Sequence, residues 1–326
     1  MRNYIIGRLI LLPLTILAVS ILVFVFMRIL PGDAAEVRCG ASGIADQTCI
    51  EGLRRELGLN ICDKADNFGE DIACTAEQYW KWVSEIFQGD FGHQIVPPRA
   101  ISEEIWWRLG NTIQLGMLSI AFSMVIGIPI GVLSAIRAGK LSDYAARFFA
   151  ILALSVPNFW IGTLIVAMPA WAWQQRWVPD WTGWAEPATH LQIMVIAALV
   201  LGISSAGYLA RIARSSMLEV MRSDYVRTAR AKGLRETLII VRHTMRPSMI
   251  TVFTIAGLQF GLILGGSAII ESLFSIPGIG FWIVNNVGDR DFQVIQAIVL
   301  ILSTWFLVIR LLVDVGYAYI DPRIRY

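Results

Sequence analysis

Long apolar stretches separated by polar ones run along the whole chain, and this pattern predicts helices that cross a membrane. A crossing needs about 20 mostly apolar residues. Six segments come close to or exceed that length: Leu9–Met27, Thr112–Ile136, Phe148–Trp173, Leu191–Leu209, Ile250–Ile270 and Val294–Ile309. We therefore expect an all-α membrane protein with about six transmembrane helices.

Composition agrees with a bilayer as the solvent. Of the 326 residues, 56% are hydrophobic and 16% are charged, whereas soluble domains carry roughly 25% charged residues. The first span could be a cleaved signal peptide, because Arg2 and Arg8 precede it. Its apolar run is longer than the usual signal core of about 7–15 residues, and no small-x-small cleavage site follows it. We therefore expect residues 1–30 to remain as an N-terminal anchor helix.

Basic residues in the short loops predict the orientation, because such loops are rich in Lys and Arg on the cytoplasmic side. Residues 211–246, between the fourth and fifth spans, hold nine basic and three acidic residues. Arg137, Lys140 and Arg147 lie between the second and third spans. These loops and both termini, including a tail at 317–326, are therefore predicted to be cytoplasmic.

The long segment 31–104 is predicted to lie outside, in the periplasm, and it holds fourteen acidic and six basic residues. Amphipathic patterns predict short helices at Glu51–Leu59 and Ala76–Phe87. The second helix carries apolar residues at helical spacing, namely Tyr79, Trp80, Val83 and Phe87. This face could lie among lipid headgroups, but packing against the helix bundle is the simpler expectation.

All four cysteines, Cys39, Cys49, Cys62 and Cys74, lie in this segment. Their confinement to the outer face predicts two disulfides and an oxidising compartment. Three pairings are open, and the nearest-neighbour pairing would contribute about 2–4 kcal/mol for each short loop that it closes. Zinc is the rival interpretation, which the absence of a CxxC motif and the single nearby histidine, His93, disfavour.

The most informative polar segment reads SDYVRTARAKGL and begins at Ser223. Ser223 or Asp224 can cap a helix N-terminus, and Gly233 suits the left-handed residue that ends a helix. The segment therefore predicts a helix of about two turns, with Ala229 and Ala231 beside long cations. It could rest on anionic lipid, but a compact helix with small residues and charge also suits a cleft on a partner protein.

The sequence YVRTARAKGL, followed by Arg242-His243 and Pro247, resembles the cytoplasmic signature loop of permeases of binding-protein-dependent ABC importers. More narrowly, the chain is similar to the dipeptide and oligopeptide permease subfamily over nearly its whole length. The other motifs that carry this resemblance are ILPGD at Ile29, LRRELGL at Leu53, GDFG at Gly89, NTI at Asn111, GIPIG at Gly127, SVPNFW at Ser155, IPGIG at Ile276 and DPR at Asp321.

The chain departs from the general importer signature, which begins Glu-Ala-Ala. Arg227, Thr228 and Ala229 occupy those places, and Met245-Arg246-Pro247 replaces the later Leu-Pro. The peptide subfamily commonly departs in the same way. A salt bridge that needs the signature glutamate is therefore not expected.

The resemblance implies a type I importer permease fold in a bacterial inner membrane, with a small external helical, disulfide-bonded segment. It implies a second homologous permease, forming a heterodimer, and two ATPase subunits that bind the ATP and Mg. A periplasmic protein would deliver di- or oligopeptides, although nickel complexes, opines and oligosaccharides stay open as cargo. The residues implied to couple the ATPases are Ser223, Asp224, Tyr225, Val226, Arg227, Thr228, Ala229, Arg230, Ala231, Lys232 and Gly233.

Small and polar residues in the spans give further candidates. Gly257, Gly261 and Gly265 repeat every fourth position, which lets another helix approach closely. They could pack within the chain, or they could face a partner permease or the solute path together with Gln259 and Asn158. No charged residue lies in the middle of a span, which argues against a carrier with an ionisable relay.

No motif for chemistry accompanies these spans. Gly139-Lys140 lacks the remainder of a phosphate-binding loop, and His93, His190 and His243 lie on separate segments. We therefore expect no ATPase site, no metal site and no nucleic-acid binding in this chain.

The competing functional hypothesis is a self-sufficient channel or secondary carrier. The predicted domains are the anchor 1–30, the external segment 31–104, the permease core 105–316 with its coupling loop 211–247, and the tail 317–326.

Overall fold

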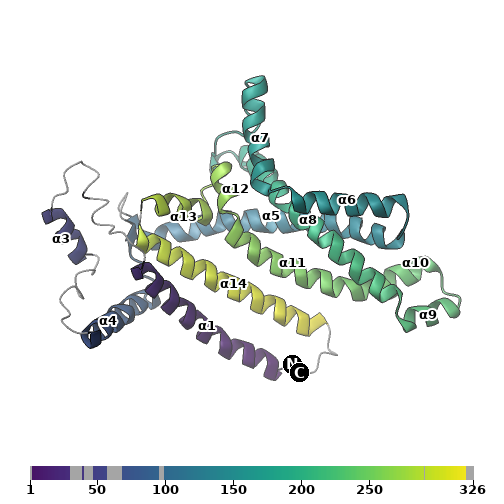
Figure 1. Ribbon diagram of the computed structural model, residues 1–326, viewed down its shortest axis with the longest axis horizontal. Helices are drawn as coiled ribbons and strands as arrows, with labels where there is room; N and C mark the ends of the chain where they lie inside the picture. Colours follow the sequence, from purple (N-terminus) through teal and green to yellow (C-terminus); the bar gives the residue numbers. More distant parts are fainter. Residues whose placement is uncertain are drawn as a thin grey trace. The chain divides into compact units, whose positions relative to one another are not determined.

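The computed structural model describes residues 2–29, 39, 47–56, 68–94, 99–289 and 291–320, and within them the chain is almost entirely helical (Figure 1). The α-helices are α1 (Arg2–Ile29), α3 (Gln47–Glu56), α4 (Phe68–Phe87), α5 (Ile101–Ile136), α6 (Leu141–Ser155), α7 (Asn158–Trp173), α8 (Pro187–Met221), α9 (Asp224–Ala231), α10 (Glu236–Leu238), α11 (Arg246–Gly266), α12 (Ala268–Leu273), α13 (Ile279–Gly288) and α14 (Phe292–Ile320). A 3₁₀ turn, η2 (Gly183–Ala185), precedes α8, and a π-helical segment, η3 (Ile239–Met245), precedes α11.

Two short strands, which the sequence pattern did not predict, form a hairpin before α5. Strand β1 (His93–Gln94) pairs antiparallel with β2 (Arg99–Ala100). The two predicted helices of this region exist with different limits. Helix α3 begins four residues before the predicted start, at Gln47, and α4 begins eight residues before its predicted start, at Phe68.

Five helices of the described part are long and apolar enough to cross a membrane, and the bent pair α6–α7 makes a sixth span if it is counted as one. The prediction of one continuous helix over Phe148–Trp173 is wrong. Helix α6 ends at Ser155, and α7 leaves it at an angle of 81° (Figure 1). Pro157 explains the break, because proline has no N–H to donate and disfavours helical geometry in the residue before it.

The chain forms two compact units, each of which is built from segments far apart in the sequence. One unit contains residues 1–9, 110–280 and 305–326, and the other contains residues 10–109 and 281–304.

Helix α8 is the centre of the first unit, and small residues bring its neighbours to backbone contact. A Cβ added to Gly127 of α5 would lie 2.5 Å from the carbonyl oxygen of Ala206, and one added to Gly131 would lie 2.4 Å from that of Ala210. On another face, an added Cβ at Gly207 would lie 2.9 Å from the carbonyl oxygen of Ala150 in α6. Helices α5 and α6 can therefore pack on α8 only because these positions lack side chains.

The repeated glycines of α11 serve packing within the chain at two of their three positions. An added Cβ at Gly257 would meet Val313 at 2.3 Å, and one at Gly261 would meet Phe306 at 2.9 Å, both in α14. At Gly265 an added Cβ would have no described atom within 4 Å. Close packing therefore explains Gly257 and Gly261, whereas Gly265 borders open space.

In the second unit, α4 packs on α1 through part of its predicted aromatic face. The Tyr79 hydroxyl lies 2.7 Å from the Ser20 hydroxyl, and its ring meets that of Phe24 at 5.2 Å. Trp82, which the prediction did not place on this face, lies 5.6 Å from Phe24 between ring centroids. Trp80 and Phe87 point away and are 73% and 87% exposed, because the packed stripe is rotated from the predicted one.

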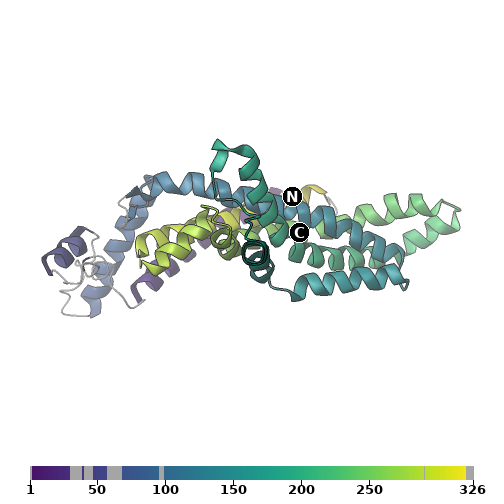
Figure 2. The same cartoon turned by 90° about the horizontal axis from the view of Figure 1, so that it is seen from above.

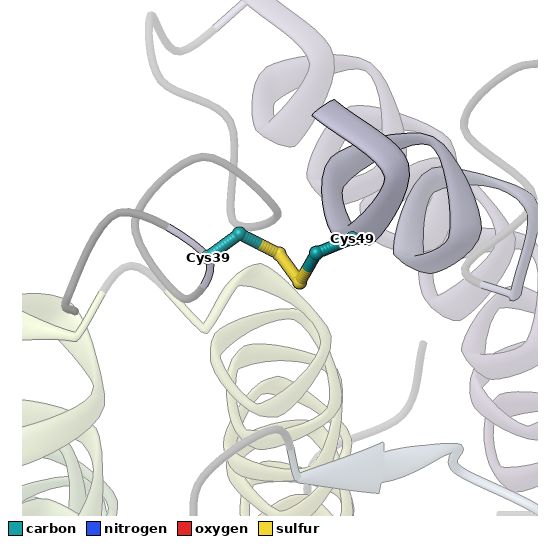
Figure 3. The surroundings of a disulfide bond; sticks show 2 residues. All are labelled: Cys39 and Cys49. Atoms are coloured by element: carbon teal, nitrogen blue, oxygen red, sulfur yellow. A yellow bond between two sulfur atoms is a disulfide. The ribbon is translucent and has the colours of Figure 1, made fainter. Parts of the chain in front are cut away.

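The three cysteines that the structure describes, Cys39, Cys49 and Cys74, are disulfide-bonded, as predicted. Cys39 is bonded to Cys49 across a separation of ten residues, which ties the start of α3 to the chain before it (Figure 3). This is the nearest-neighbour pairing for the first two cysteines. Cys74 is also disulfide-bonded, and Cys62 lies outside the described residues, as does Leu57 of the predicted first amphipathic helix.

The packing of α5 on α8 predicts that alanine substitutions at two glycines of α5 change the stability by different amounts. Gly131→Ala should lower the stability by about 1–3 kcal/mol, because the helices must separate to admit a methyl group. Gly110→Ala is the matched control, since an added Cβ there has no described atom within 4 Å. Thermal unfolding of the detergent-solubilised protein measures both. Equal midpoints for the two variants would contradict the close approach.

Candidate functional site

The predicted short helix exists as α9, and its C-terminal end forms as the sequence predicts. Ser223 has extended backbone angles and occupies the N-cap position, but its hydroxyl donates to the Val220 carbonyl oxygen at 2.6 Å and does not cap the helix. At the other end, Gly233 has a φ of +76°. The Gly233 N–H donates to the Arg230 carbonyl, and the Leu234 N–H donates to the Ala229 carbonyl. These two bonds form a Schellman motif.

One face of α9 is buried in the chain itself. Val226 is fully buried and Ala229 is 7% exposed, and both pack with Ile239 of η3 and Val220 of α8. Ala229 was grouped with Ala231 as a small residue for a partner cleft, but the two point in different directions. Ala229 faces the chain's own helices, and only Ala231 is exposed. Val226 and Ala229 therefore hold α9 in place.

The opposite face of α9 is exposed and mainly basic. Its exposed side chains are those of Asp224, Tyr225, Arg227, Thr228, Arg230, Ala231 and Lys232. Arg227 lies 3.6 Å from Asp224, with the two side chains 71% and 98% exposed, so solvent screens this pair and it adds little stability. Three cations against one acid leave this face positive.

Arg230 also fixes the turn that follows α9. Its guanidinium makes two hydrogen bonds to the carboxylate of Glu236, at 2.7 and 3.2 Å. Hydrogen bonding to Glu236 raises the pKa of Arg230. This ion pair joins α9 to α10.

The buried face of α9 packs against the π-helical segment η3. Pro247, just beyond it in α11, has no N–H with which to close an ordinary helical turn onto the His243 carbonyl. The Tyr225 hydroxyl donates to that carbonyl oxygen at 3.3 Å. π-helical segments often occur at functional sites, and this one connects the base of α9 to a transmembrane helix.

The predicted candidates in the membrane form a separate group from α9. Gly257, Gly261 and Gly265 lie on α11, as does the half-buried Gln259. Asn158 begins α7, and its Oδ1 is buried without a hydrogen-bond partner among the described residues. The structure does not bring these residues together with the exposed face of α9.

Two buried carboxylates, which the sequence analysis missed, hold parts of the first unit. Glu271 of α12 is fully buried and accepts hydrogen bonds from Thr112 at 2.9 Å and Ser267 at 2.7 Å. Thr112 in turn accepts the N–H of Ile279, and Gly278 leaves the space that the carboxylate fills. Glu271 follows the predicted fifth span directly, so the count of charges within spans did not include it.

The second carboxylate, Asp143, lies in the loop that was noted for its basic residues. It is 1% exposed and binds Arg214 of α8. A single acid in a basic loop is the sequence signal that could have pointed to it. Over the described residues, no three His, Cys, Asp or Glu side chains gather in a way that could hold a metal ion.

Substitution of Gly233 distinguishes the cost of an unfavourable backbone conformation from the cost of a steric clash. An added Cβ at Gly233 meets no described atom within 4 Å, so Gly233→Ala should cost about 1–2 kcal/mol only because alanine disfavours a positive φ. Hydrogen exchange of the Leu234 amide should accelerate. Gly233→Asn is the control, because asparagine adopts this conformation more readily. Unchanged exchange in the alanine variant would contradict the helix end described above.

Comparison with known families gives matches along the chain. Residues 127–326 match the family described as binding-protein-dependent transport system inner membrane component. Residues 1–98 match the N-terminal region of the binding-protein-dependent transport system membrane component. The exposed face of α9 lies within the first of these matches.

Two full-length relatives carry the same name. The chain is 40% identical to the glutathione transport system permease protein GsiC of Pectobacterium atrosepticum, over 326 residues that cover all of both chains. It is 37% identical to the protein of that name from Escherichia coli (strain K12), again over the full length of both.

Solved structures share the fold at lower identity. An amino acid ABC transporter solved with histidines gives a TM-score of 0.53 at 18% identity, covering 65% of this chain and 92% of that one. The MetNI methionine ABC transporter in an inward facing conformation gives 0.52 at 17% identity, covering 65% and 94%. At such identities the likeness shows the fold alone.

Proposed function

The chain belongs to the family of binding-protein-dependent transport system inner membrane components, and we propose that α9 is the element through which it receives the work of ATP hydrolysis. It is a multi-pass permease of an ABC importer in the inner membrane and is not itself the ATPase. The family decides against a self-sufficient channel or secondary carrier. What remains to be assigned is how this chain engages its partners and which cargo it passes.

The observation that carries the proposal is the two-sided construction of α9. Val226 and Ala229 fasten one face to α8 and η3, and the other face presents cations and the small Ala231 to solvent. A segment that only binds lipid would need positive charge but would not need to be packed firmly against other helices. A helix that transmits force needs both a docking face and a rigid attachment to the rest of the chain. The buried cluster of Val226, Ala229 and Ile239 supplies that attachment.

We infer a complete importer of two ATPase subunits that bind ATP and Mg, a second, homologous permease and a periplasmic binding protein. In this arrangement α9 and both termini lie on the cytoplasmic side. The disulfide-bonded segment 31–104 lies in the periplasm, where an oxidising environment keeps the Cys39–Cys49 bond formed. The open space at Gly265 makes this part of α11 the candidate contact with the second permease or the solute path.

A bulky residue on the docking face tests the role of α9. Ala231→Trp changes an exposed position, so the permease should insert and stay folded. Its steric bulk should reduce co-purification of the ATPase subunits by roughly 10-fold, which corresponds to about 1.4 kcal/mol. Ala188→Trp, at an exposed position in the first turn of α8, is the control. Normal recovery of the ATPases with Ala231→Trp would overturn the proposal.

For the cargo we propose a small peptide such as glutathione, on the strength of the names that the full-length relatives carry. Liposomes containing the assembled importer, its binding protein and ATP should accumulate tritiated glutathione. Unlabelled di- and tripeptides should compete for this uptake, whereas a nickel complex, an opine or an oligosaccharide should not. ATP-dependent uptake of one of these other solutes, without uptake of glutathione, would contradict the peptide assignment.

A further inference from the structure

The Asp143 carboxylate is the meeting point of three structural elements. Its Oδ1 accepts hydrogen bonds from the Ser134 hydroxyl at 2.6 Å and from Nε of Arg214 at 2.8 Å. Its Oδ2 accepts from the Gly139 N–H at 2.9 Å and from Nη2 of Arg214 at 3.0 Å. Arg147, one turn further along α6, approaches Oδ1 at 3.5 Å. Both oxygens are therefore saturated, and the arginine is held in two-pronged geometry.

These contacts bind a helical hairpin to α8. Ser134 belongs to α5, Gly139 belongs to the turn after it, and Asp143 lies in the first turn of α6. Arg214 lies on α8, ten positions before α9 begins at Asp224. Figure 1 and Figure 2 show α6 running alongside α8 toward the end that carries α9. The hairpin and α9 are thus both attached to the same end of one helix.

Close packing alone does not hold this end of α6. The backbone approach at Gly207 involves Ala150 and Ala153, two turns further into α6. Nearer the hairpin turn, Leu141 and Tyr144 are 85% and 58% exposed. The Asp143–Arg214 pair attaches the first turn of α6 to α8.

Burial distinguishes this pair from the other ion pairs near α9. Asp143 is 1% exposed and Arg214 is 24% exposed, whereas both partners of the Arg230–Glu236 pair are about half exposed. A buried two-pronged pair resists displacement because separation would leave a charge without a partner away from water. It can therefore carry a mechanical load that a screened surface pair cannot.

We propose that Asp143 and Arg214 are positioning residues for energy coupling, which make the α5–α6 hairpin move with α8 when α9 is displaced. The inference rests on the proposed role of α9 as the ATPase docking element, and it adds the route by which displacement of α9 reaches two further helices. Without the pair, α8 would move and the first turn of α6 would lag behind it.

Spin labels on α6 and α8 of the assembled complex test this inference without knowledge of the cargo. Labels at Phe148→Cys and Ser215→Cys occupy exposed positions on the two helices. With intact Asp143, their distance distribution should stay the same when ATP and Mg are added to complexes whose ATPases bind but do not hydrolyse ATP. In Asp143→Asn and Arg214→Gln, the distribution should shift or broaden on ATP binding.

Two further variants control for simple loss of stability. The double variant Asp143→Asn/Arg214→Gln leaves no unpaired charge, so it should recover stability while its labels still separate on ATP binding. Arg176→Gln removes an exposed ion pair with Asp180, outside α9, and should leave the distance between α6 and α8 unchanged. In proteoliposomes, import of tritiated glutathione per ATP hydrolysed should fall roughly 2- to 30-fold in the double variant. This fall should exceed any decrease in the amount of folded complex.

If the distance distribution between the two labels does not change on ATP binding in any Asp143 or Arg214 variant, the inference is wrong. Failure of this inference and failure of the proposed function give different results. If α9 is not the docking element, Ala231→Trp retains its ATPases. If only the route through Asp143 is wrong, Ala231→Trp loses them, while the labelled helices move together with or without the ion pair.

Discussion

The backbone contact between α8 and its neighbours is the constraint on which the first unit depends. At Gly127, Gly131 and Gly207, carbonyl oxygens of the facing helix occupy the space where side chains would otherwise lie. Such interfaces gain from dispersion contacts over many atoms and not from a hydrophobic driving force, which lipid does not supply between helices. They also leave little freedom for sliding. A displacement applied at one end of α8 is therefore carried along its length.

This rigidity explains why the polar contacts gather at the ends of helices. Asp143, Glu271 and the Arg230–Glu236 pair each fix a turn or a helix start where close packing stops. The π-helical η3 also lies at a helix end. It contacts the buried face of α9 and leads directly into α11. Packing holds the middles of the helices, and a few saturated polar groups hold their ends.

The sequence predicted α9 closely because its signals are local: good helix formers and a glycine at a positive φ, although the Ser223 side chain does not cap the helix as expected. It also predicted that Cys39, Cys49 and Cys74 are disulfide-bonded and that another helix approaches closely at Gly257 and Gly261. It failed where the answer depended on tertiary contacts. The orientation of Ala229, the rotation of the α4 aromatic stripe and the partners of Asp143 are set by helices distant in the chain. The break at Pro157 was a local signal that a long apolar run concealed.

Photo-crosslinking on the assembled importer tests the central claim most directly. A photoreactive amino acid at Arg227, on the exposed face of α9, should form a covalent adduct with an ATPase subunit, and one at Ala188 should not. The account predicts that the adduct at Arg227 forms in the membrane-embedded complex. An intact, ATP-hydrolysing complex that gives no ATPase adduct from Arg227, Thr228 or Lys232 would contradict it.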